Sequence, residues 1–443
     1  MIDFTEKKFG VISLGCDKNR VDTEKLLAII RDKGCTITDD ISAAQILVVN
    51  TCAFLNESRK EAVETVLECS VYKSQNLEKL VVCGCLPQKF ISQTFDGLVE
   101  ADVFLGTDDY ANFFPALEKA YMGERVNFVG TGGVVSTKRV LSTPAHYAYL
   151  KIADGCDNHC TYCLIPKIRG RYRSVPIEEL LEEASGLGDV AELILVAQDV
   201  TRYGIDIYGQ KKLREILQKL TALVNINSVR LLYCYPDMLD DDLIEEIRDN
   251  PKIVKYLDIP LQHSENRILK LMNRTGSRED YLALIEKLRK NIQGIAIRST
   301  FISGFPTETE EEFENLKTFL REARLDNCGF FAYSREPETA AYKLKGQLNY
   351  SVRKSRVSQL YAIQKEISLS KLQSCIGKKF KVLCDGIDYE RECFVGRTYF
   401  QAPDIDGKVY FNARFASQGE YTEVLIENTD GYDLFGRTED FNA

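Results

Sequence analysis

The sequence has little histidine and no long apolar segment. Only three histidines, His146, His159 and His263, occur among its 443 residues. Mixed cysteine and histidine zinc sites therefore have few ligands to draw on, and a metal site in this chain must be rich in thiolates. No apolar run approaches the length of about 18 to 20 residues that crosses a bilayer, so we expect no membrane-spanning segment.

Basic charge is also in deficit. Acidic residues outnumber basic ones 66 to 57, which gives a net charge of -9 and a pI near 5.3. The chain is therefore a poor electrostatic partner for a phosphate backbone, and we expect basic partners and no direct RNA specificity. The sequence begins MIDFTEKKFG without a charged-then-apolar leader, so we expect a cytoplasmic protein in a reducing compartment. A monomer is also expected.

The rest of the composition is that of a globular protein. Apolar residues make up 44% and charged residues 28% of the chain, a balance that excludes wholesale disorder and collagen-like fibres. The length corresponds to about three domains of roughly 150 residues each. Cysteine is the unusual component, with 14 copies in a chain expected to stay reduced, so metal or redox chemistry explains it better than disulfides do.

Strands and helices alternate in the first part of the chain. The predicted elements, in order, are strand Phe9 to Leu14, helix Val21 to Lys33, strand Ile46 to Asn50, helix Glu57 to Tyr72 and strand Leu80 to Cys83. This order is typical of a parallel, Rossmann-like α/β domain, which we assign to residues 1–125. Residues 126–144 include a stretch rich in glycine, serine and threonine and are predicted to be a linker.

The alternation resumes in residues 145–372. Six further strands are predicted, at Tyr147 to Ile152, Glu192 to Ala197, Ser228 to Tyr233, Tyr256 to Pro260, Ala296 to Ile302 and Asn327 to Tyr333. Six such units indicate a partial or complete TIM-type barrel, which a polar helix at Val352 to Leu372 follows. Residues 373–443 are punctuated by glycine and predict a small all-β barrel of about five strands. The expected fold class is α/β with a terminal β-barrel.

Three cysteines lie close together in the segment ADGCDNHCTYCLIP, directly after a predicted strand. Cys156, Cys160 and Cys163 have the spacing Cys-x3-Cys-x2-Cys, so their thiolates must face a common centre. Zinc would need a fourth ligand, whereas a 4Fe-4S cluster can be held by three thiolates with one iron left open for substrate. His159 could complete a zinc site, but its neighbours on the loop would force it away from the thiolate side.

A second set of three cysteines is dispersed over the first domain. Cys16, Cys52 and Cys85 each lie at or just beyond the carboxyl end of a predicted parallel strand. Because those ends converge on one crevice, we expect the three thiols to become neighbours and to form a second cluster site. The alternative is three buried structural thiols, the usual role of a lone cysteine. A turn marked by glycine and proline favours Cys85 over Cys83 as the third ligand. We interpret the other eight as core fillers or surface thiols: Cys35, Cys69, Cys83, Cys234, Cys328, Cys375, Cys384 and Cys393.

The two sets together resemble the methylthiotransferases over nearly the whole chain. The triplet, with Tyr162 before its last cysteine, looks like the signature of the radical S-adenosylmethionine (SAM) enzymes, and a TRAM-type β-barrel ends such chains. The resemblance implies two 4Fe-4S clusters and SAM as cofactors, with an electron donor and a sulfur source as partners. In that family a radical made from SAM takes hydrogen from an unactivated carbon, which ordinary acid–base groups cannot deprotonate. A C–H bond becomes C–S–CH3.

Several segments resemble the branch of this family that modifies an aspartate β-carbon in small-subunit ribosomal protein twelve. They are LGCDKNRVDTE at 14–24, AQDVTRYGIDIYG at 197–209, LLYCYPD at 231–237, YLDIPLQH at 256–263 and GRTYFQAPDIDGKVY at 396–410. Transfer RNA adenosine is the alternative substrate within the family. A non-catalytic metal-binding protein that associates with ribosomes is the alternative from another class.

The charge of the terminal barrel bears on the same choice. Residues 378–443 contain 8 basic and 13 acidic residues, a net charge of -5. A barrel that grips RNA by its backbone should be basic, whereas an acidic one suits a ribosomal protein rich in lysine and arginine. An acidic surface that only keeps the protein soluble is the competing explanation.

Five residues are predicted to bind SAM. The resemblance implies that Tyr162 lies at the SAM cluster, that Glu192 binds the SAM amino group and that Gly304 lies beside the adenine. Arg298 and Thr300, on the strand before Gly304, could reach the ribose or the carboxylate. The competing explanations are a solvated charge for Glu192 and a plain turn glycine for Gly304.

Two further residues are predicted to be catalytic. Asp199 and Arg202 follow the second strand of the barrel domain at its carboxyl end, where catalytic and substrate-binding groups of such barrels belong. Structural capping is the competing role. The sequence departs from the family pattern at Asp17, where proline is expected, and at Thr307, in GFPTETEEEF, where glycine is usual. Neither residue is a ligand, so the departures put loop geometry in question more than activity.

Overall fold

The computed structural model describes residues 2–132 and 137–442, and it divides into two units. The first unit comprises Met1–Ser142, Asp154–Asp157 and Cys163–Leu187, and the second comprises Thr143–Ala153, Asn158–Tyr162 and Gly188–Ala443. The domain boundaries given above stay predictions. Part of the expected linker, residues 133–136, lies outside the described residues.

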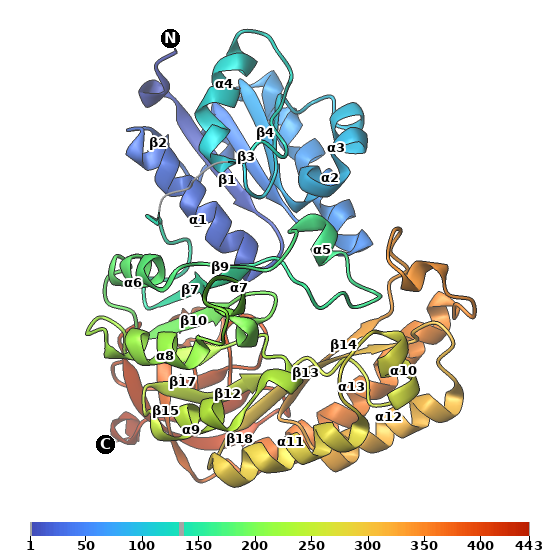
Figure 1. The fold of residues 1–443 in the computed structure, drawn as a ribbon. Helices are drawn as coiled ribbons and strands as arrows, with labels where there is room; N and C mark the ends of the chain where they lie inside the picture. The colour runs from blue at the N-terminus through green and yellow to red at the C-terminus, as the bar shows by residue number, and fades with distance from the viewer. Residues whose placement is uncertain (1, 133–136, 443) are drawn as a thin grey trace. The chain divides into compact units, whose positions relative to one another are not determined.

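A parallel sheet forms the centre of the first unit (Figure 1). Its six strands run in the order β2-β1-β3-β4-β5-β6, and each neighbouring pair is parallel. Every residue of the central strand β3 is buried, as expected where helices cover both faces of a sheet. The predicted Rossmann-like α/β domain is confirmed, and β6 extends it into the segment expected to be a linker. The strands are β1 (Lys8–Ser13), β2 (Thr36–Ile37), β3 (Ile46–Thr51), β4 (Lys79–Gly84), β5 (Val103–Leu105) and β6 (Val126–Asn127).

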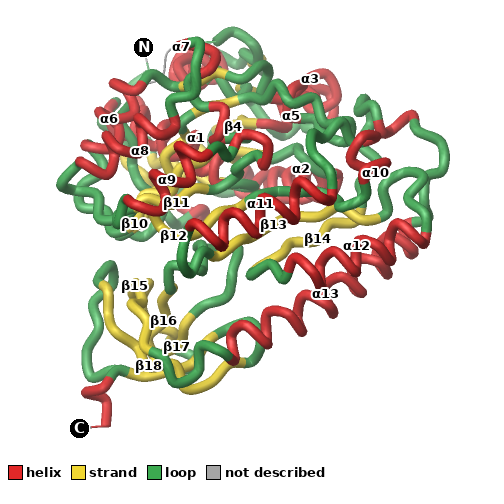
Figure 2. Tube along the Cα trace, turned by 60° about the horizontal axis from the view of Figure 1, so that its bottom comes forward, coloured by secondary structure: helices red, strands yellow, loops and turns green. Residues whose placement is uncertain are grey.

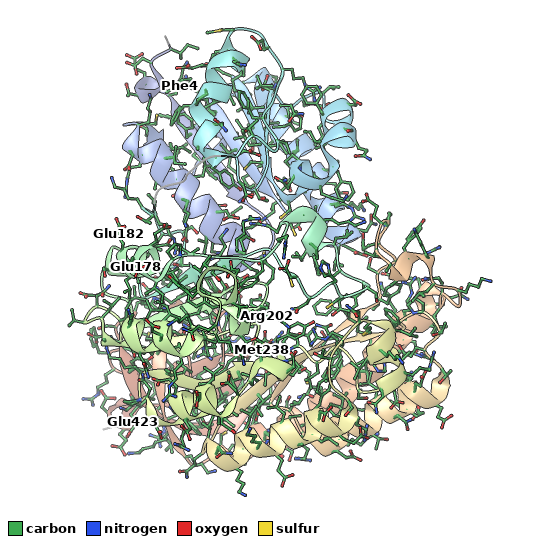
Figure 3. The ribbon with its side chains drawn as sticks, in the orientation of Figure 1. Phe4, Glu178, Glu182, Arg202, Met238 and Glu423 are labelled. Atoms are coloured by element: carbon green, nitrogen blue, oxygen red, sulfur yellow. The ribbon has the colours of Figure 1, made fainter. Side chains whose placement is uncertain are left out.

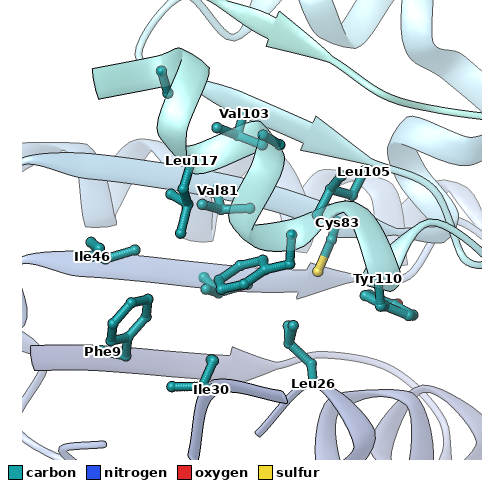
Figure 4. Close-up of a cluster of buried hydrophobic side chains, with 14 of the residues drawn as sticks. Phe9, Leu26, Ile30, Ile46, Val81, Cys83, Val103, Leu105, Tyr110 and Leu117 are labelled. Carbon is teal, nitrogen blue, oxygen red and sulfur yellow. The ribbon is translucent and has the colours of Figure 1, made fainter. Parts of the chain in front are cut away.

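Helices cover both faces of this sheet. Leu26 of α1 and Leu117 of α4 pack with Val81 of β4 on one face (Figure 4). Val66 of α2 packs on the other face. Each large apolar side chain buried in this way contributes about 1.5–3 kcal/mol. The helices are α1 (Asp17–Asp32), α2 (Asn56–Ser70), α3 (Cys85–Gly97) and α4 (Phe113–Tyr121).

Residues 163–187 belong to the first unit, although the sequence places them in the predicted barrel domain. Leu164, just before α5 (Ile165–Ile168), and Ile168, at its end, are buried with Ala62 of α2 and Leu86 of α3. This burial of apolar side chains holds the segment against the first sheet's helices. The two-stranded sheet of β8 (Ala153–Asp154) and β9 (Arg173–Ser174) and the helix α6 (Ile177–Ser185) complete this region.

A second parallel sheet forms the centre of the second unit. Its six strands run in the order β14-β13-β12-β11-β10-β7, which is simple chain order, and the described residues do not close it into a barrel. The prediction of six βα units is confirmed as a partial barrel. The strands are β7 (Tyr147–Lys151), β10 (Glu192–Val196), β11 (Val229–Leu231), β12 (Ile253–Asp258), β13 (Ala296–Ser303) and β14 (Asn327–Ala332).

Helices follow the strands of this sheet in the expected alternation. The longest, α13, lies beside β14 and leads to the terminal barrel (Figure 2). The helices are α7 (Ile205–Tyr208), α8 (Leu213–Ala222), α9 (Asp241–Asp249), α10 (Asn266–Leu271), α11 (Arg278–Asn291), α12 (Glu310–Ala323) and α13 (Tyr350–Gln373). None of the described helices combines the length and the apolar character needed to cross a membrane.

The terminal region is a closed barrel of five strands, as predicted. Its strands are paired in the order β15-β16-β17-β19-β18 around a core that includes Val382, Phe411 and Ile426. Gly396 allows two strands to approach closely, because a Cβ there would lie 2.3 Å from the carbonyl oxygen of Leu383. The strands are β15 (Lys379–Asp388), β16 (Cys393–Arg397), β17 (Val409–Asn412), β18 (Tyr421–Thr429) and β19 (Leu434–Arg437).

Buried polar contacts join this barrel to the second sheet, and one of them is made by the first residue of a strand. Arg397 of β16 donates to Glu192, the first residue of β10, at 2.5 Å. The hydroxyl of Tyr256 on β12 donates to Asp406 at 2.6 Å. The barrel therefore packs at the end of the sheet opposite to the one where the strands of a βα barrel carry their active sites.

Candidate active site

The dispersed cysteines lie at the carboxyl ends of adjacent strands in the first unit. Cys16 precedes α1 two residues after Leu14, Cys52 follows β3 directly, and Cys85 begins α3 immediately after β4. The strands β1, β3 and β4 are neighbours in the sheet. The topology therefore brings together three cysteines that are separated by up to 69 residues of sequence.

The three thiols influence one another electrostatically. Burial is the largest cause that raises the pKa of Cys52 and of Cys85, and the charge of Cys16 raises both further, with a pKa of about 12 for Cys85. Cys52 also packs against Gly15, where a Cβ would lie 2.6 Å from the Cys52 Cβ. Cys52 and Cys85 are buried, whereas Cys16 is exposed. The cluster of thiols is therefore open to solvent on the Cys16 side.

The chemistry of these thiols fits a metal cluster. A thiol with a raised pKa stays protonated in the metal-free protein, and a metal cation supplies the charge that allows the sulfur to bind as thiolate. Among the described residues, no three His, Cys, Asp or Glu side chains already converge closely enough to hold a metal ion. The fit therefore rests on the donor set and on the shared position of the thiols.

Cys83 differs from Cys85 in its surroundings. Its side chain lies in the core beneath α1 and α4, where burial raises its pKa well above the ordinary range (Figure 4). Gly84 between them has a φ of +93°, and a Cβ there would lie 2.2 Å from Asn50. This glycine turn separates a core cysteine from one that follows the strand end, and the assignment of Cys85 as the third ligand stays a prediction.

A buried arginine contacts this thiol set, and sequence reasoning missed it. Arg169 Nη1 donates to Asp22 at 2.7 Å and to Asp154 at 2.9 Å, while Nη2 donates to Cys85 Sγ at 3.4 Å and to Asn19. Burial lowers the pKa of Arg169, but Asp154, Cys85 and Asp22 outweigh it and raise the pKa well above its ordinary value. No spacing rule points to this residue, because its partners lie far from it in the sequence.

The clustered cysteines are all partly exposed. In the first unit, the Cys156 backbone N–H donates to the carbonyl of Gly170, and Cys163 Sγ accepts from the Ile165 N–H at 3.4 Å. In the second unit, Cys160 Sγ lies 3.1 Å from the hydroxyl of Tyr235. His159 is exposed. The donor set is three thiols within eight residues of chain, which suits a cluster held by three cysteines.

Asp199 and Arg202 lie together at the carboxyl end of β10. Asp199 is fully buried, and its Oδ2 accepts from Arg202 Nε at 3.1 Å and from Asn158 Nδ2 at 3.0 Å. Burial raises the pKa of Asp199 despite these donors. Arg202, which Figure 3 labels, is partly exposed. It also approaches Asp237 at 3.7 Å. The structure thus places both predicted catalytic residues beside the loop that carries Cys160, with Asp199 in a capping role as well.

Tyr162 and Gly304 lie near each other on the carboxyl side of the second sheet. Tyr162 packs against the cluster that contains Phe305 and Met272. Gly304 has a φ of +77°, and a Cβ there would lie 2.3 Å from Arg353 Cγ, so only glycine fits this turn. The neighbouring Thr307 also has a positive φ, +71°, in the position where the sequence pattern led us to expect glycine.

Glu192, Arg298 and Thr300 are not brought together with these residues. Glu192 is aligned with Tyr147, the first residue of β7, and therefore lies at the opposite end of the sheet from the loop that follows β7. Its carboxylate accepts from Arg230 at 2.6 Å and from Arg397 at 2.5 Å. Burial opposes ionisation, but the two arginines outweigh it and lower the pKa of Glu192. These are the contacts of a structural ion pair and differ from the predicted SAM contact.

Arg298 is likewise engaged with the barrel side of the sheet. It donates to Asp258 at 2.9 Å and approaches Asp406 at 3.5 Å, and it also donates to Thr300 Oγ1 at 3.3 Å. The sequence pattern assigns these residues to the correct strand. It does not indicate that Asp258 of the adjacent strand and Asp406 of the barrel would lie beside Arg298.

Two residues missed by sequence reasoning lie beside Cys160. Besides contacting the Cys160 sulfur, Tyr235 donates its backbone N–H to Thr201 Oγ1 at 3.1 Å. The guanidinium of Arg274 stacks on the Tyr235 ring at 3.8 Å from its centroid. Tyr235 belongs to the segment LLYCYPD, so the signal available in the sequence was its position just after a strand.

Three family models match successive parts of the chain. Residues 8–106 match the model described as uncharacterized protein family UPF0004, residues 150–320 match the radical SAM superfamily, and residues 376–438 match the TRAM domain. The three matched segments have the order that the cysteine pattern and the terminal barrel led us to expect.

Curated relatives match over nearly the full length. A protein of Lachnoclostridium phytofermentans is 45% identical over 98% of this chain and 100% of its own, and one of Thermoanaerobacter sp. (strain X514) is 42% identical over 97% and 99%. A third, from Acetivibrio thermocellus, is 43% identical over 97% of this chain and 98% of its own. Each is named ribosomal protein uS12 methylthiotransferase RimO.

Solved structures share the fold at low sequence identity. The radical SAM methyltransferase TsrM of Kitasatospora setae, solved with cobalamin and a 4Fe-4S cluster, has a TM-score of 0.57 at 14% identity, covering 86% of this chain and 81% of its own. The cobalamin-dependent SAM radical enzyme OxsB has a TM-score of 0.51 at 12% identity, covering 82% of this chain and 56% of its own. At such identities these likenesses establish the fold alone.

Proposed function

This chain belongs to the family of ribosomal protein uS12 methylthiotransferases, and we propose that it inserts a methylthio group at the β-carbon of an aspartate in ribosomal protein uS12. It is a radical SAM methylthiotransferase, and enzymes of this kind use SAM and 4Fe-4S clusters. The observation that carries the proposal is the presence of both cysteine sets in a chain that matches these relatives from end to end.

The two cysteine sets are the residues proposed to hold the clusters. The ligands of the cluster that binds SAM are Cys156, Cys160 and Cys163, and the ligands of the second cluster are Cys16, Cys52 and Cys85. When bound, SAM and the clusters supply hydrogen abstraction from an unactivated carbon, the inserted sulfur and the methyl group. Three thiolates leave one iron of each cluster without a protein ligand, which suits the binding of SAM at one site and of sulfur at the other.

The residues around Cys160 are proposed to orient its loop and to meet the substrate. Tyr235 holds the Cys160 sulfur from one side, and buried Asp199 holds Asn158, two residues earlier in the chain. The partly exposed Arg202 is left to bind the substrate backbone or carboxylate. Tyr162 and Gly304 are proposed to line the SAM site from the same side of the sheet.

The acidic terminal barrel supports a basic protein substrate. Its net charge of -5 disfavours binding to a phosphate backbone and favours a ribosomal protein rich in lysine and arginine. We further propose that the enzyme works as a cytoplasmic monomer and that an electron donor and a sulfur source act as its partners. Transfer RNA adenosine is the competing substrate.

Mass spectrometry of a deletion strain tests the substrate. Loss of the gene should remove a methylthio mass increment from ribosomal protein uS12 and leave the transfer RNA nucleosides unchanged. Loss of the methylthio group from transfer RNA nucleosides with an unchanged ribosomal protein uS12 would identify RNA as the substrate. Anaerobic purification tests the enzyme itself, which should be brown and carry about eight irons per chain. Colourless, zinc-loaded protein would instead support a non-catalytic metal-binding role.

A further inference from the structure

The guanidinium of Arg169 lies between the dispersed cysteine set and the segment that leads to Cys156. Its side chain is only 2% exposed, and all of the partners described above belong to the first unit. Asp154 is two residues before Cys156, and Cys85 is one of the three dispersed thiols. One planar group therefore ties the Cys85 sulfur to the backbone that carries the first cysteine of the triplet.

The two halves of this guanidinium have different partners. Nη1 satisfies both carboxylates, Asp22 and Asp154, at 2.7 and 2.9 Å. Nη2 points at the Cys85 sulfur and at the amide oxygen of Asn19. A purely structural ion pair would need only the Nη1 contacts, because Asp22 and Asp154 already compensate the buried charge of the guanidinium. The second half donates an N–H to a sulfur that is proposed to bind iron.

Arg139 provides a contrast within the same unit. Its side chain is 1% exposed, and like Arg169 it pairs with two carboxylates, Glu24 and Glu183. Both arginines thus join distant parts of the first unit through buried ion pairs. What distinguishes Arg169 is its hydrogen bond to the sulfur of Cys85, one of the dispersed thiols.

We propose that Arg169 is a positioning residue for the cluster held by Cys16, Cys52 and Cys85, and that its N–H···S hydrogen bond raises the reduction potential of that cluster. The inference rests on the proposed function, because it requires these cysteines to bind the cluster. Reduction adds one electron, and no bond forms or breaks. A donor N–H and a positive charge beside a thiolate sulfur stabilise the more negative, reduced state, which is how hydrogen bonds to sulfur tune such clusters.

The test isolates this cluster in the full-length chain. A parent protein with Cys156, Cys160 and Cys163 replaced by alanine retains only the dispersed set, and it is reconstituted with iron and sulfide. The main variant is Arg169→Met with Asp22→Asn, which removes one charge of each sign and so leaves the net charge of the site unchanged. Leaving Asp22 charged without the arginine would be more disruptive. The matched control is Arg139→Met with Glu24→Gln.

The readouts are iron and sulfide content, the electron paramagnetic resonance spectrum and the midpoint potential in a titration with dithionite. We expect the main variant to retain its cluster with an altered spectrum and a lower potential. The ratio of reduced to oxidised cluster at a fixed potential should fall by about tenfold, equivalent to about 59 mV for one electron. Arg169→Lys should give a smaller shift in the same direction, because the ammonium keeps the charge but loses the planar fork. The control should keep the parent potential.

Three outcomes would overturn the inference. One is a loaded main variant with the parent spectrum and potential, and another is an equal shift in the Arg139 control. If the main variant does not fold, the Arg169→Lys variant is measured in its place. The third outcome is then an Arg169→Lys protein whose cluster has the same midpoint potential as the parent. A parent that binds no iron would refute the second cluster of the proposed function itself, which separates that failure from a failure of the role of Arg169.

Discussion

One buried arginine site in each unit can be compared with the other, because the two lie at opposite ends of their own sheets. In the first unit, Arg169 lies at the carboxyl end, against Cys85 and two carboxylates. In the second unit, Arg230 and Arg397 surround Glu192 at the amino end, where the terminal barrel packs. A desolvated guanidinium with carboxylates therefore contacts a cysteine in one unit and joins the terminal barrel to the sheet in the other.

The cysteine sets differ in a related way. The dispersed set depends on the first sheet to bring its members together, and two of its thiols are buried. The clustered set lies within eight residues of chain and is partly exposed throughout. We infer that folding creates the first site, whereas the local sequence already creates most of the second.

The largest expected effect separates the two sets by function. Replacing Cys156, Cys160 or Cys163 by alanine should abolish both SAM cleavage and thiolation, because both require that cluster. Replacing Cys16, Cys52 or Cys85 should abolish thiolation and leave SAM cleavage intact. Chromatography with mass spectrometry of 5'-deoxyadenosine and of the modified substrate measures the two reactions.

The control for this comparison is Cys69→Ala, a core cysteine packed beneath the first sheet. It should leave both reactions unchanged and cost about 1 kcal/mol of stability. Loss of SAM cleavage in the Cys16, Cys52 or Cys85 variants would mean that the division of labour between the two clusters is wrong.

The next effect tests the structural junction at the amino end of the second sheet. Glu192→Gln leaves Arg230 and Arg397 buried without their shared carboxylate, so we expect a loss of about 3–5 kcal/mol in the free energy of unfolding. Urea denaturation of the apoprotein measures it. Glu427→Gln, which removes a half-exposed ion pair with Arg437 on the barrel, should cost less than about 1 kcal/mol.

The same variant also tests the assignment of Glu192. If Glu192 bound the SAM amino group, as the sequence analysis predicts, the reconstituted Glu192→Gln protein would bind SAM much more weakly without a large loss of stability. We expect the opposite pattern, with reduced stability and SAM affinity within a few-fold of the unmodified enzyme.

The smallest effect concerns a half-exposed ion pair and sharpens the contrast with the buried ones. Burial raises the pKa of Glu312, but hydrogen bonds from Arg267 and Thr309 outweigh it and lower the pKa to about 2 from an ordinary 4.5. The stabilisation is therefore complete above about pH 4.5 and is lost as the pH falls toward 2. Because Arg267 is 49% exposed, we expect only about 1–2 kcal/mol.

Acid titration of stability measures this contribution. Glu312→Gln should be less stable than the unmodified protein at pH 7, and the difference between the two should shrink as the pH is lowered from 5 to 2. A difference that stays constant over this range would show that the side chain acts through packing rather than through its charge.

Much of the fold could be predicted because its signals are local. The run ILVV of β3 and the alternation of strands with amphipathic helices indicate parallel sheets, and the glycine-punctuated end indicates the small barrel. Residues 163–187 group with the first unit, and the sequence pattern alone does not indicate this grouping. The apolar character of Leu164 and Ile168 predicts that they are buried, but it does not indicate which apolar surface buries them. Tertiary packing determines that surface.

The sequence by itself determined the two cysteine sets, the order of the sheets and barrel, and the acidity of the terminal region. Cysteine spacing and the ends of strands are local properties, so they can be identified from the sequence alone. Only the tertiary structure decided that Arg169 contacts Cys85, that Tyr235 contacts Cys160, and that Glu192 pairs with Arg397 of the barrel. These contacts join residues 75 to 205 positions apart, and a side chain at such a separation finds its partner through the packing of whole elements rather than through any pattern near it.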